Sequence, residues 1–127
     1  MDIDAYQSVI EIEGLEGRVF KTPGAGKTSK PFRVAEHDEW GLSLGTSAGG
    51  RVKVRAAAFE AALKYLSDFG CRGDSWLPVS DMGFQDLMRF ENDQKACGSY
   101  VLPLLEAAGL VEIERKRPAR VRLRARE

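Results

Sequence analysis

The pattern of hydrophobic residues changes near residue 54, and this change restricts the chain to a mixed α and β fold. Before that point, short apolar runs alternate with clusters of turn-forming residues, which is typical of strands joined by hairpins. After that point, apolar residues recur at helical spacing. We therefore expect an α+β protein in which residues 1–54 form antiparallel β hairpins or a small meander. The expected strands are Ser8–Glu13, Gly17–Lys21, Phe32–Ala35, Trp40–Leu44 and Val52–Val54.

The second part of the chain combines helical spacing with short extended segments. The strongest signal is Arg55–Phe69, where Phe59, Leu63 and Leu66 repeat at helical spacing and Gly70 supplies a C-terminal stop. Strict alternation of apolar and polar residues near the C-terminus predicts a β-hairpin. In chain order, the expected elements are helix Arg55–Phe69, a short strand at Ser75–Val79, a helix from Ser80 or Asp81 to Phe90, a polar turn at Glu91–Cys97, a helix capped by Ser99 and ending near Ala108, and strands Val111–Arg115 and Arg120–Ala125.

This order of elements resembles the winged helix-turn-helix family over residues 55–127. The segment Ser99–Arg115 carries the resemblance, because Leu105–Val111 matches the turn that joins the third helix of that family to its hairpin, the wing. The resemblance implies a DNA-binding domain whose third helix enters a groove and whose wing contacts the phosphate backbone. A weaker similarity, which includes Gly98–Val101, is to accessory modules of restriction and modification-dependent DNA systems. Since ~73 residues make a small core, we expect residues 1–54 to pack on this domain in one shared core.

The charges of the chain are unevenly distributed although they sum to zero. The chain has 19 Lys and Arg residues and 19 Asp and Glu residues. Residues 1–114 hold 12 basic and 18 acidic side chains, whereas residues 115–126 hold seven basic and no acidic ones. An acidic body with a basic end is a charge asymmetry that suggests a nucleic-acid partner.

The basic C-terminal hairpin is the first candidate site. The even-numbered positions of 120–126 are all arginine, and a strand places them on one face. Glu112 and Glu114 are expected to pair across the hairpin with two of these arginines, which leaves the tip uncompensated, namely Arg115, Lys116, Arg117 and Arg120. Duplex DNA is the expected ligand and RNA the other candidate, with a log–log salt slope of roughly −3.6 for four phosphate contacts; a solvated hairpin end without a ligand is the alternative. The predicted phosphate-binding residues are Arg115, Lys116, Arg117, Arg120, Arg122 and Arg124.

The expected third helix carries few side chains suited to reading bases. Its predicted outward positions, Tyr100, Pro103, Glu106 and Ala107, make no bidentate contact with a base edge. Readout would then come from the start of the helix and the turn before it. The residues predicted to approach the groove are Lys95, Ser99 and Tyr100, with Asn92 and Gln94 as further candidates. The apolar outward positions favour a second hypothesis, in which the chain is an assembly module that binds a partner protein or forms a homodimer.

Two other segments resemble functional motifs without matching them. Gly24–Ser29 resembles a phosphate-binding loop, but Lys21 stands where the nucleotide motif requires Gly. We expect a hairpin loop whose lysines, Lys21, Lys27 and Lys30, can contact a nucleic-acid backbone. Glu36–Glu39 surrounds the only histidine and is expected to be a polar turn rather than a metal site.

The remaining residues indicate a non-enzymatic protein without a metal or cofactor, because no catalytic or ligand set has credible spacing. Cys71 and Cys97 make no disulfide framework, which favours a reducing cytoplasm. No apolar run approaches the ~18 residues of a membrane helix, so no membrane partner is expected. Trp40 and Trp76 are expected to be core aromatics.

Overall fold

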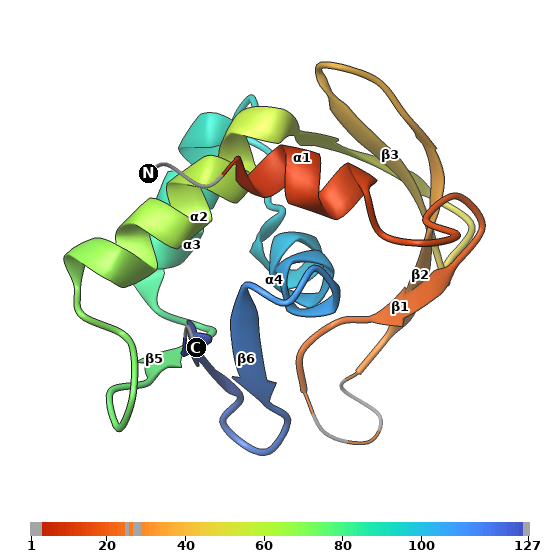
Figure 1. Ribbon diagram of the computed structural model, residues 1–127. Coiled ribbons are helices and arrows are strands. Elements are labelled where there is room, and N and C mark those ends of the chain that lie inside the picture. The colour runs from red at the N-terminus through yellow and green to blue at the C-terminus, as the bar shows by residue number, and fades with distance from the viewer. Residues whose placement is uncertain (1–3, 25, 27–28, 126–127) are drawn as a thin grey trace.

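The computed structural model describes residues 4–24, 26 and 29–125. Within these residues the chain forms the predicted α+β fold, with a four-stranded antiparallel meander ordered β1-β2-β3-β4 and a three-stranded sheet ordered β5-β7-β6 (Figure 1). The helices are α1 (Ala5–Ile10), α2 (Ala56–Asp68), α3 (Met82–Glu91) and α4 (Gly98–Ala107). The strands are β1 (Val19–Lys21), β2 (Pro31–His37), β3 (Gly41–Thr46), β4 (Arg51–Arg55), β5 (Leu77–Pro78), β6 (Val111–Glu114) and β7 (Arg120–Leu123).

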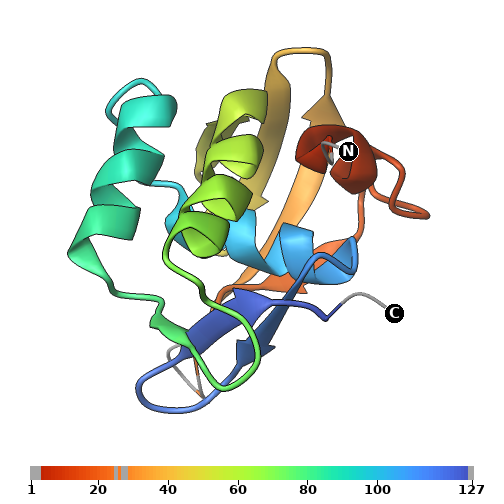
Figure 2. The same cartoon turned by 60° about the vertical axis from the view of Figure 1, so that its left-hand side comes forward.

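Helix α4 lies at the centre of the fold, between the meander on one side and α2 and α3 on the other (Figures 1 and 2). It also contacts α1 and β6. All residues of the segment Val101–Leu105 are buried. The prediction that Pro103 points outward is therefore wrong. A helix enclosed on all sides is buried all round, whereas the sequence was interpreted as a surface helix with one apolar stripe.

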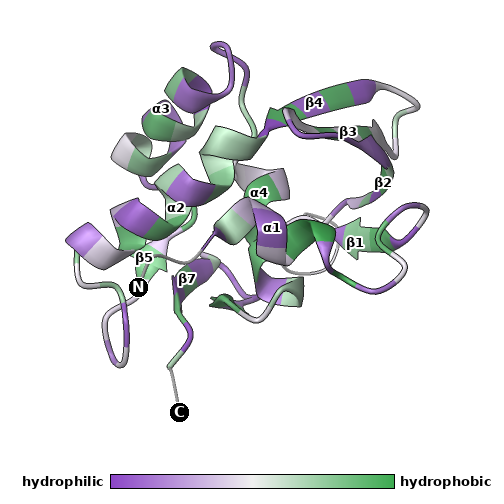
Figure 3. Ribbon diagram, turned by 45° about the horizontal axis from the view of Figure 1, so that its top comes forward, coloured by the Kyte–Doolittle hydropathy of each residue, from purple (hydrophilic) through white to green (hydrophobic). Residues whose placement is uncertain are grey.

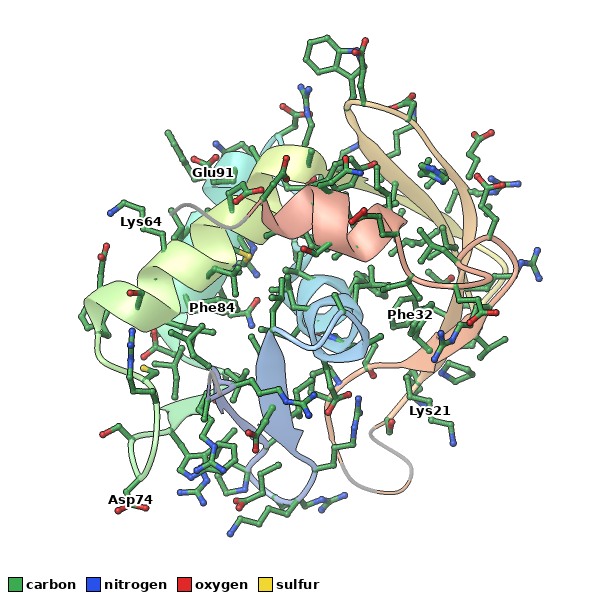
Figure 4. All side chains as sticks on the ribbon, in the orientation of Figure 1. Lys21, Phe32, Lys64, Asp74, Phe84 and Glu91 are labelled. Atoms are coloured by element: carbon green, nitrogen blue, oxygen red, sulfur yellow. The ribbon has the colours of Figure 1, made fainter. Side chains whose placement is uncertain are left out.

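Alternation along the meander determines which face of the sheet meets the core. Phe32, Val34 and Leu44 point inward and are buried, and hydrophobic and hydrophilic residues alternate along β4 (Figure 3). Phe32 lies between the sheet and α4, where the ring of Tyr100 packs edge-on against it at 5.2 Å between centroids (Figure 4). The buried residues of the meander and of the helices belong to one hydrophobic cluster. The two parts of the chain thus share a core.

The first predicted strand, Ser8–Glu13, is wrong, because α1 occupies this part of the chain. Asp4 caps the helix, and its carboxylate accepts a hydrogen bond from the Gln7 N–H at 2.9 Å. Ala5, Tyr6 and Val9 are the buried residues of α1. Their spacing is helical, but a window that begins at Ser8 does not include Ala5 and Tyr6.

The N-termini of α3 and α4 are capped differently. Asp81 caps α3 as predicted, since its carboxylate accepts a hydrogen bond from the Phe84 N–H at 2.9 Å. Helix α4 begins one residue before Ser99, so the prediction of Ser99 as its cap is wrong. A Cβ atom at Gly98 would lie 2.5 Å from Oε1 of Gln85, so a larger residue here would require the Gln85 side chain to shift.

Asn92 joins the turn before α4 to the edge of the meander. Its side chain accepts a hydrogen bond from the Arg55 N–H at 2.7 Å and donates to the carbonyl oxygens of Lys53 and Lys95 at 3.0 and 3.1 Å. Asn92 is 2% exposed. The predicted polar turn therefore contains a buried structural amide, and the prediction that Asn92 can reach a groove is wrong.

We expect both thiols to react slowly in the native protein. Cys71 and Cys97 are free and buried, and burial raises the pKa of the Cys97 thiol to about 12 and also raises that of Cys71. Because the thiolate is the reactive form, both side chains remain protonated and inert at pH 8. Dithionitrobenzoate should label them quickly in denaturant and at least ten times more slowly in buffer. Fast labelling of the folded protein would contradict this placement.

Candidate nucleic-acid interface

The C-terminal hairpin, β6 and β7, has the cross-strand charge pairs predicted for it. Glu112 lies opposite Arg122, and Glu114 lies opposite Arg120. The closest carboxylate and guanidinium atoms are 3.0 Å apart in the first pair and 2.7 Å apart in the second. The predicted pairing is confirmed, and both acids reduce the positive charge of the hairpin.

Arg120 and Arg122 have further contacts inside the chain. Their guanidinium groups lie over the Trp76 ring, 5.1 and 4.2 Å from its centroid, and Arg122 also donates to the Gly73 carbonyl. Trp76 is half-buried beneath them. The prediction that Arg120 is uncompensated is wrong. Through Trp76 and Gly73, these two arginines hold the segment before β5 against the hairpin. Because of these contacts, their side chains have little freedom to follow a phosphate backbone.

The tip of the hairpin, residues 115–119, is also partly neutralised. Arg115 pairs with Glu106 at 2.9 Å, and Lys116 pairs with Glu114 at 3.0 Å. Hydrogen bonds from Lys116 and then from Arg120 hold the pKa of Glu114 below its usual value. The prediction that Arg115 and Lys116 are uncompensated is therefore wrong.

Two exposed arginines of the hairpin have no carboxylate partner among the described residues. Arg117 and Arg124 form no ion pair within the part of the chain that the structure describes. Arg126, which the sequence places on the same face, lies outside the described residues. Of the six predicted phosphate-binding residues, Arg117 and Arg124 thus keep their full charge.

Arg115 brings a second basic segment to the hairpin tip. Its guanidinium donates to the carbonyl oxygen of Thr22 at 2.9 Å and to that of Lys21 at 3.4 Å. Lys30 lies beside Thr22, since the Lys30 N–H donates to the Thr22 hydroxyl at 2.8 Å. The loop after β1 and the hairpin tip therefore lie together at one end of the molecule (Figures 1 and 4).

We call the exposed cations of this region the basic end. It consists of Lys21, Lys30, Lys116 and Arg117. Lys21 extends into solvent (Figure 4), and neither it nor Lys30 forms an ion pair among the described residues. Lys27 belongs to the same loop but lies outside the described residues.

Lys95, Ser99 and Tyr100 do not join the basic end. The last turn of α4 contacts the hairpin through Glu106, whereas Ser99 lies at the opposite end of the helix, about 10 Å away along its axis. Ser99 is exposed, but Tyr100 is half-buried against Phe32. Lys95 lies on the turn that Asn92 docks on β4. The structure thus separates these predicted groove contacts from the predicted phosphate contacts.

A second basic surface, absent from the sequence prediction, covers the face of the meander that points away from α4. We call it the outer sheet face, and it displays Arg33, Arg51, Lys53 and Arg55 together with one acid, Glu36. Arg55 pairs with Asp93 at 2.8 Å. Arg33, Arg51 and Lys53 form no ion pair within the described residues. The sequence predicted a strand at Val52–Val54, and alternation along β4 places its three basic residues on one face.

Trp40 stands at the end of the outer sheet face and is 67% exposed, so its prediction as a core aromatic is wrong. Asp38 Oδ1 accepts hydrogen bonds from the N–H groups of Trp40 and Gly41 at 2.8 and 3.2 Å. A Cβ atom at Gly41 would lie 2.0 Å from the Val54 carbonyl oxygen. The backbones of β3 and β4 therefore approach closely at Gly41, where only glycine fits.

A hollow of about 640 Å³ borders Trp40. Its lining includes Ser43, Lys53 and Glu36 of the outer sheet face, and Lys95 from the turn before α4. Lys95 and Asn92, both sequence candidates for groove contact, line it. The hollow therefore connects the sheet surface with the exposed indole.

No group of three or more His, Cys, Asp or Glu side chains among the described residues could hold a metal ion. His37 instead pairs through Nδ1 with Glu16 at 2.9 Å. No helix in the described part of the chain has the length and apolar character needed to cross a membrane. No family model, curated protein or solved structure matches the chain. The function is therefore inferred from the residues of the site.

Proposed function

We propose that the chain is a non-enzymatic nucleic-acid-binding domain of the winged helix type, which contacts the phosphates of duplex DNA through its basic end. The observation that carries the proposal is the contact of Arg115 with Thr22, which brings two basic segments distant in sequence to one place. RNA is the alternative ligand, since phosphate contacts alone do not distinguish the two. Accessory modules of restriction and modification-dependent DNA systems are one setting for such a domain.

The enclosed position of α4 supports binding to the backbone rather than to base edges. A helix that reads bases must enter the major groove, but α4 is covered by the meander and by three helices. Lys and Arg contacts to phosphate release counterions and do not depend on the sequence. We therefore expect weak sequence preference and strong salt dependence.

Removing three exposed cations of the basic end should weaken duplex binding. In the variant Lys21→Ala, Lys30→Ala, Arg117→Ala, the log–log salt slope should fall in magnitude by about 2.7, at about 0.9 for each lost phosphate contact. Fluorescence anisotropy with a labelled duplex at several salt concentrations measures this slope. These three side chains form no ion pair among the described residues, so their loss should leave stability nearly unchanged.

The matched control carries the same loss of charge on the helical side of the molecule. In the variant Lys64→Ala, Arg72→Ala, Arg89→Ala, three exposed cations of α2, α3 and the loop after α2 are removed. Its affinity and salt slope should remain close to those of the parent protein. Equal affinity and slope for the parent and the basic-end variant would overturn the proposal.

A protein-interaction module, including a homodimer, is the second candidate. The sequence suggested this candidate through an apolar outward face on α4. That face is not available, because Pro103 and Tyr100 are largely covered. A different observation favours it, since Phe69, Met82 and Phe90 are 65%, 78% and 69% exposed on the α2 and α3 side. Sedimentation velocity that finds only a monomer would remove the homodimer form of this candidate.

A further inference from the structure

The outer sheet face carries an excess of positive charge that the proposed function does not use. Arg33, Arg51 and Lys53 are exposed, and no ion pair within the described residues neutralises them. Arg51 donates a long hydrogen bond to the Ser43 hydroxyl at 3.4 Å. No helix covers this side of the sheet (Figure 1), so the three cations face solvent together.

The central strand of this surface has small side chains, which makes the surface flat. Gly45 lies opposite both Arg33 and Arg51, and Ser43 lies opposite Lys53. The two arginines are therefore about 10 Å apart across three strands, and Lys53 is about 7 Å along β4 from Arg51. The Arg33 side chain lies across Gly45, where a Cβ atom would be 3.4 Å from its Nε atom. An extended polyanion can contact all three cations in this arrangement.

Trp40 provides an aromatic surface at the end of the same face. Its turn is held by the two hydrogen bonds to Asp38 Oδ1, and the Tyr6 hydroxyl donates to the Asp38 carbonyl at 2.6 Å. The Arg55 guanidinium lies 5.9 Å from the centroid of the indole. An exposed ring on a rigid turn loses little conformational freedom when a flat ligand stacks on it.

The hollow beside Trp40 has as many lining cations as carboxylates, the cations being Lys53, Arg55 and Lys95. Three carboxylates line it, but Asp93 is paired with Arg55, and one oxygen of Asp38 accepts the two backbone hydrogen bonds of the turn. Glu36 is the remaining acid, and Lys53 and Lys95 line the hollow without an ion pair among the described residues. The volume of about 640 Å³ lies within the ~300–1,000 Å³ range of ligand pockets.

We propose that the outer sheet face binds single-stranded nucleic acid, with phosphates on Arg33, Arg51 and Lys53 and one base stacked on Trp40. Proteins bind single strands in this way by combining cations that follow the backbone with aromatic rings that stack bases. The inference shares its ligand class with the proposed function. It uses a different surface and a different form of nucleic acid, and the two proposals can therefore fail separately.

The fluorescence of Trp40 tests the inference directly. In the variant Trp76→Phe, Trp40 is the single tryptophan, and titration with a 12-nucleotide oligodeoxythymidylate should quench its emission in a saturable way. In the protein that keeps Trp76, the substitution Trp40→Ala should lower the affinity for this oligonucleotide by about 5- to 150-fold, measured by anisotropy of a labelled copy. Trp40 is exposed, so this substitution should leave the fold intact.

The sheet cations are tested with the same oligonucleotide. The variant Arg33→Ala, Arg51→Ala, Lys53→Ala should lower the magnitude of the salt slope by about 2, at about 0.7 for each contact with a single strand. The control substitutions Lys64→Ala, Arg72→Ala, Arg89→Ala and the basic-end substitutions are each combined with Trp76→Phe. In both proteins the oligonucleotide should still quench the fluorescence of Trp40. Absence of quenching, or equal loss of affinity in the sheet variant and the control variant, would overturn the inference. If Trp40 is quenched while the basic-end variant keeps full duplex affinity, the inference stands and the proposed function fails.

Discussion

Replacement of Leu102 by alanine is expected to destabilise the protein by about 3–5 kcal/mol. Leu102 is 0% exposed and lies in the central helix α4, which packs against the meander, the other helices and β6. Surrounding elements on every side hold the backbone in place, and the cavity left by the lost side chain can close only in part. The free energy of unfolding from urea denaturation, followed by circular dichroism, measures the loss.

The control for Leu102 lies on the same helix. Ala107 is exposed near the end of α4, and Ala107→Ser should change the free energy of unfolding by less than about 0.5 kcal/mol. A loss below about 1 kcal/mol for Leu102→Ala would show that this face of α4 is accessible. It would then restore α4 as a candidate for entering a groove, which the buried position of the helix argues against.

Replacement of Asn92 by alanine should cost about 2–4 kcal/mol of stability. The side chain satisfies the Arg55 N–H and the carbonyl oxygens of Lys53 and Lys95 in a buried place, and alanine leaves all three without that partner. Buried backbone groups without a hydrogen bond carry the full cost of desolvation. Because Asn92 joins the α3–α4 turn to the meander, its loss should also loosen the contact between the two parts of the chain.

Two further variants distinguish the contribution of the Asn92 amide to stability from that of the rest of the turn. Lys95→Ala changes an exposed side chain in the same turn and should leave stability within about 0.5 kcal/mol of the parent. Asn92→Asp keeps the size of the side chain but removes the donors to two carbonyl oxygens, so it should destabilise at least as much as alanine. Unfolding free energies for Asn92→Ala equal to that of Lys95→Ala would contradict the structural role of the amide.

Tertiary contacts neutralise many of the charges that a count along the chain treats as free. The sequence places seven basic residues at positions 115–126, and most of those that the structure describes are engaged within the chain. Glu106, Glu112 and Glu114 pair with Arg115, Arg122 and Arg120, and Lys116 shares Glu114. The acidic body meanwhile contains a basic face, because β2 and β4 turn their cations to one side of the meander. Net charge over a segment therefore did not locate the unpaired cations.

The helices and strands after residue 15 followed from local patterns in the sequence. The apolar run Val52–Val54 predicted β4, alternation with period two predicted the C-terminal hairpin, and the spacing of Phe59 and Leu66 predicted α2. Helix α1 was missed because it has only six residues and short elements carry a weak periodic signal. The pairing of Glu112 and Glu114 with arginines was also predicted, since strand register follows from the hairpin.

The sequence by itself thus determined the α+β class, most of the strands before residue 55, the C-terminal hairpin and its cross-strand charge pairs. Only the tertiary structure decided that α4 is enclosed, that Asn92 is buried and that Trp40 is exposed. It also decided that Arg115 places Lys21 and Lys30 beside the hairpin tip. The physical reason is range: periodicity and capping act over a few residues, whereas burial and charge pairing depend on elements that meet only after folding.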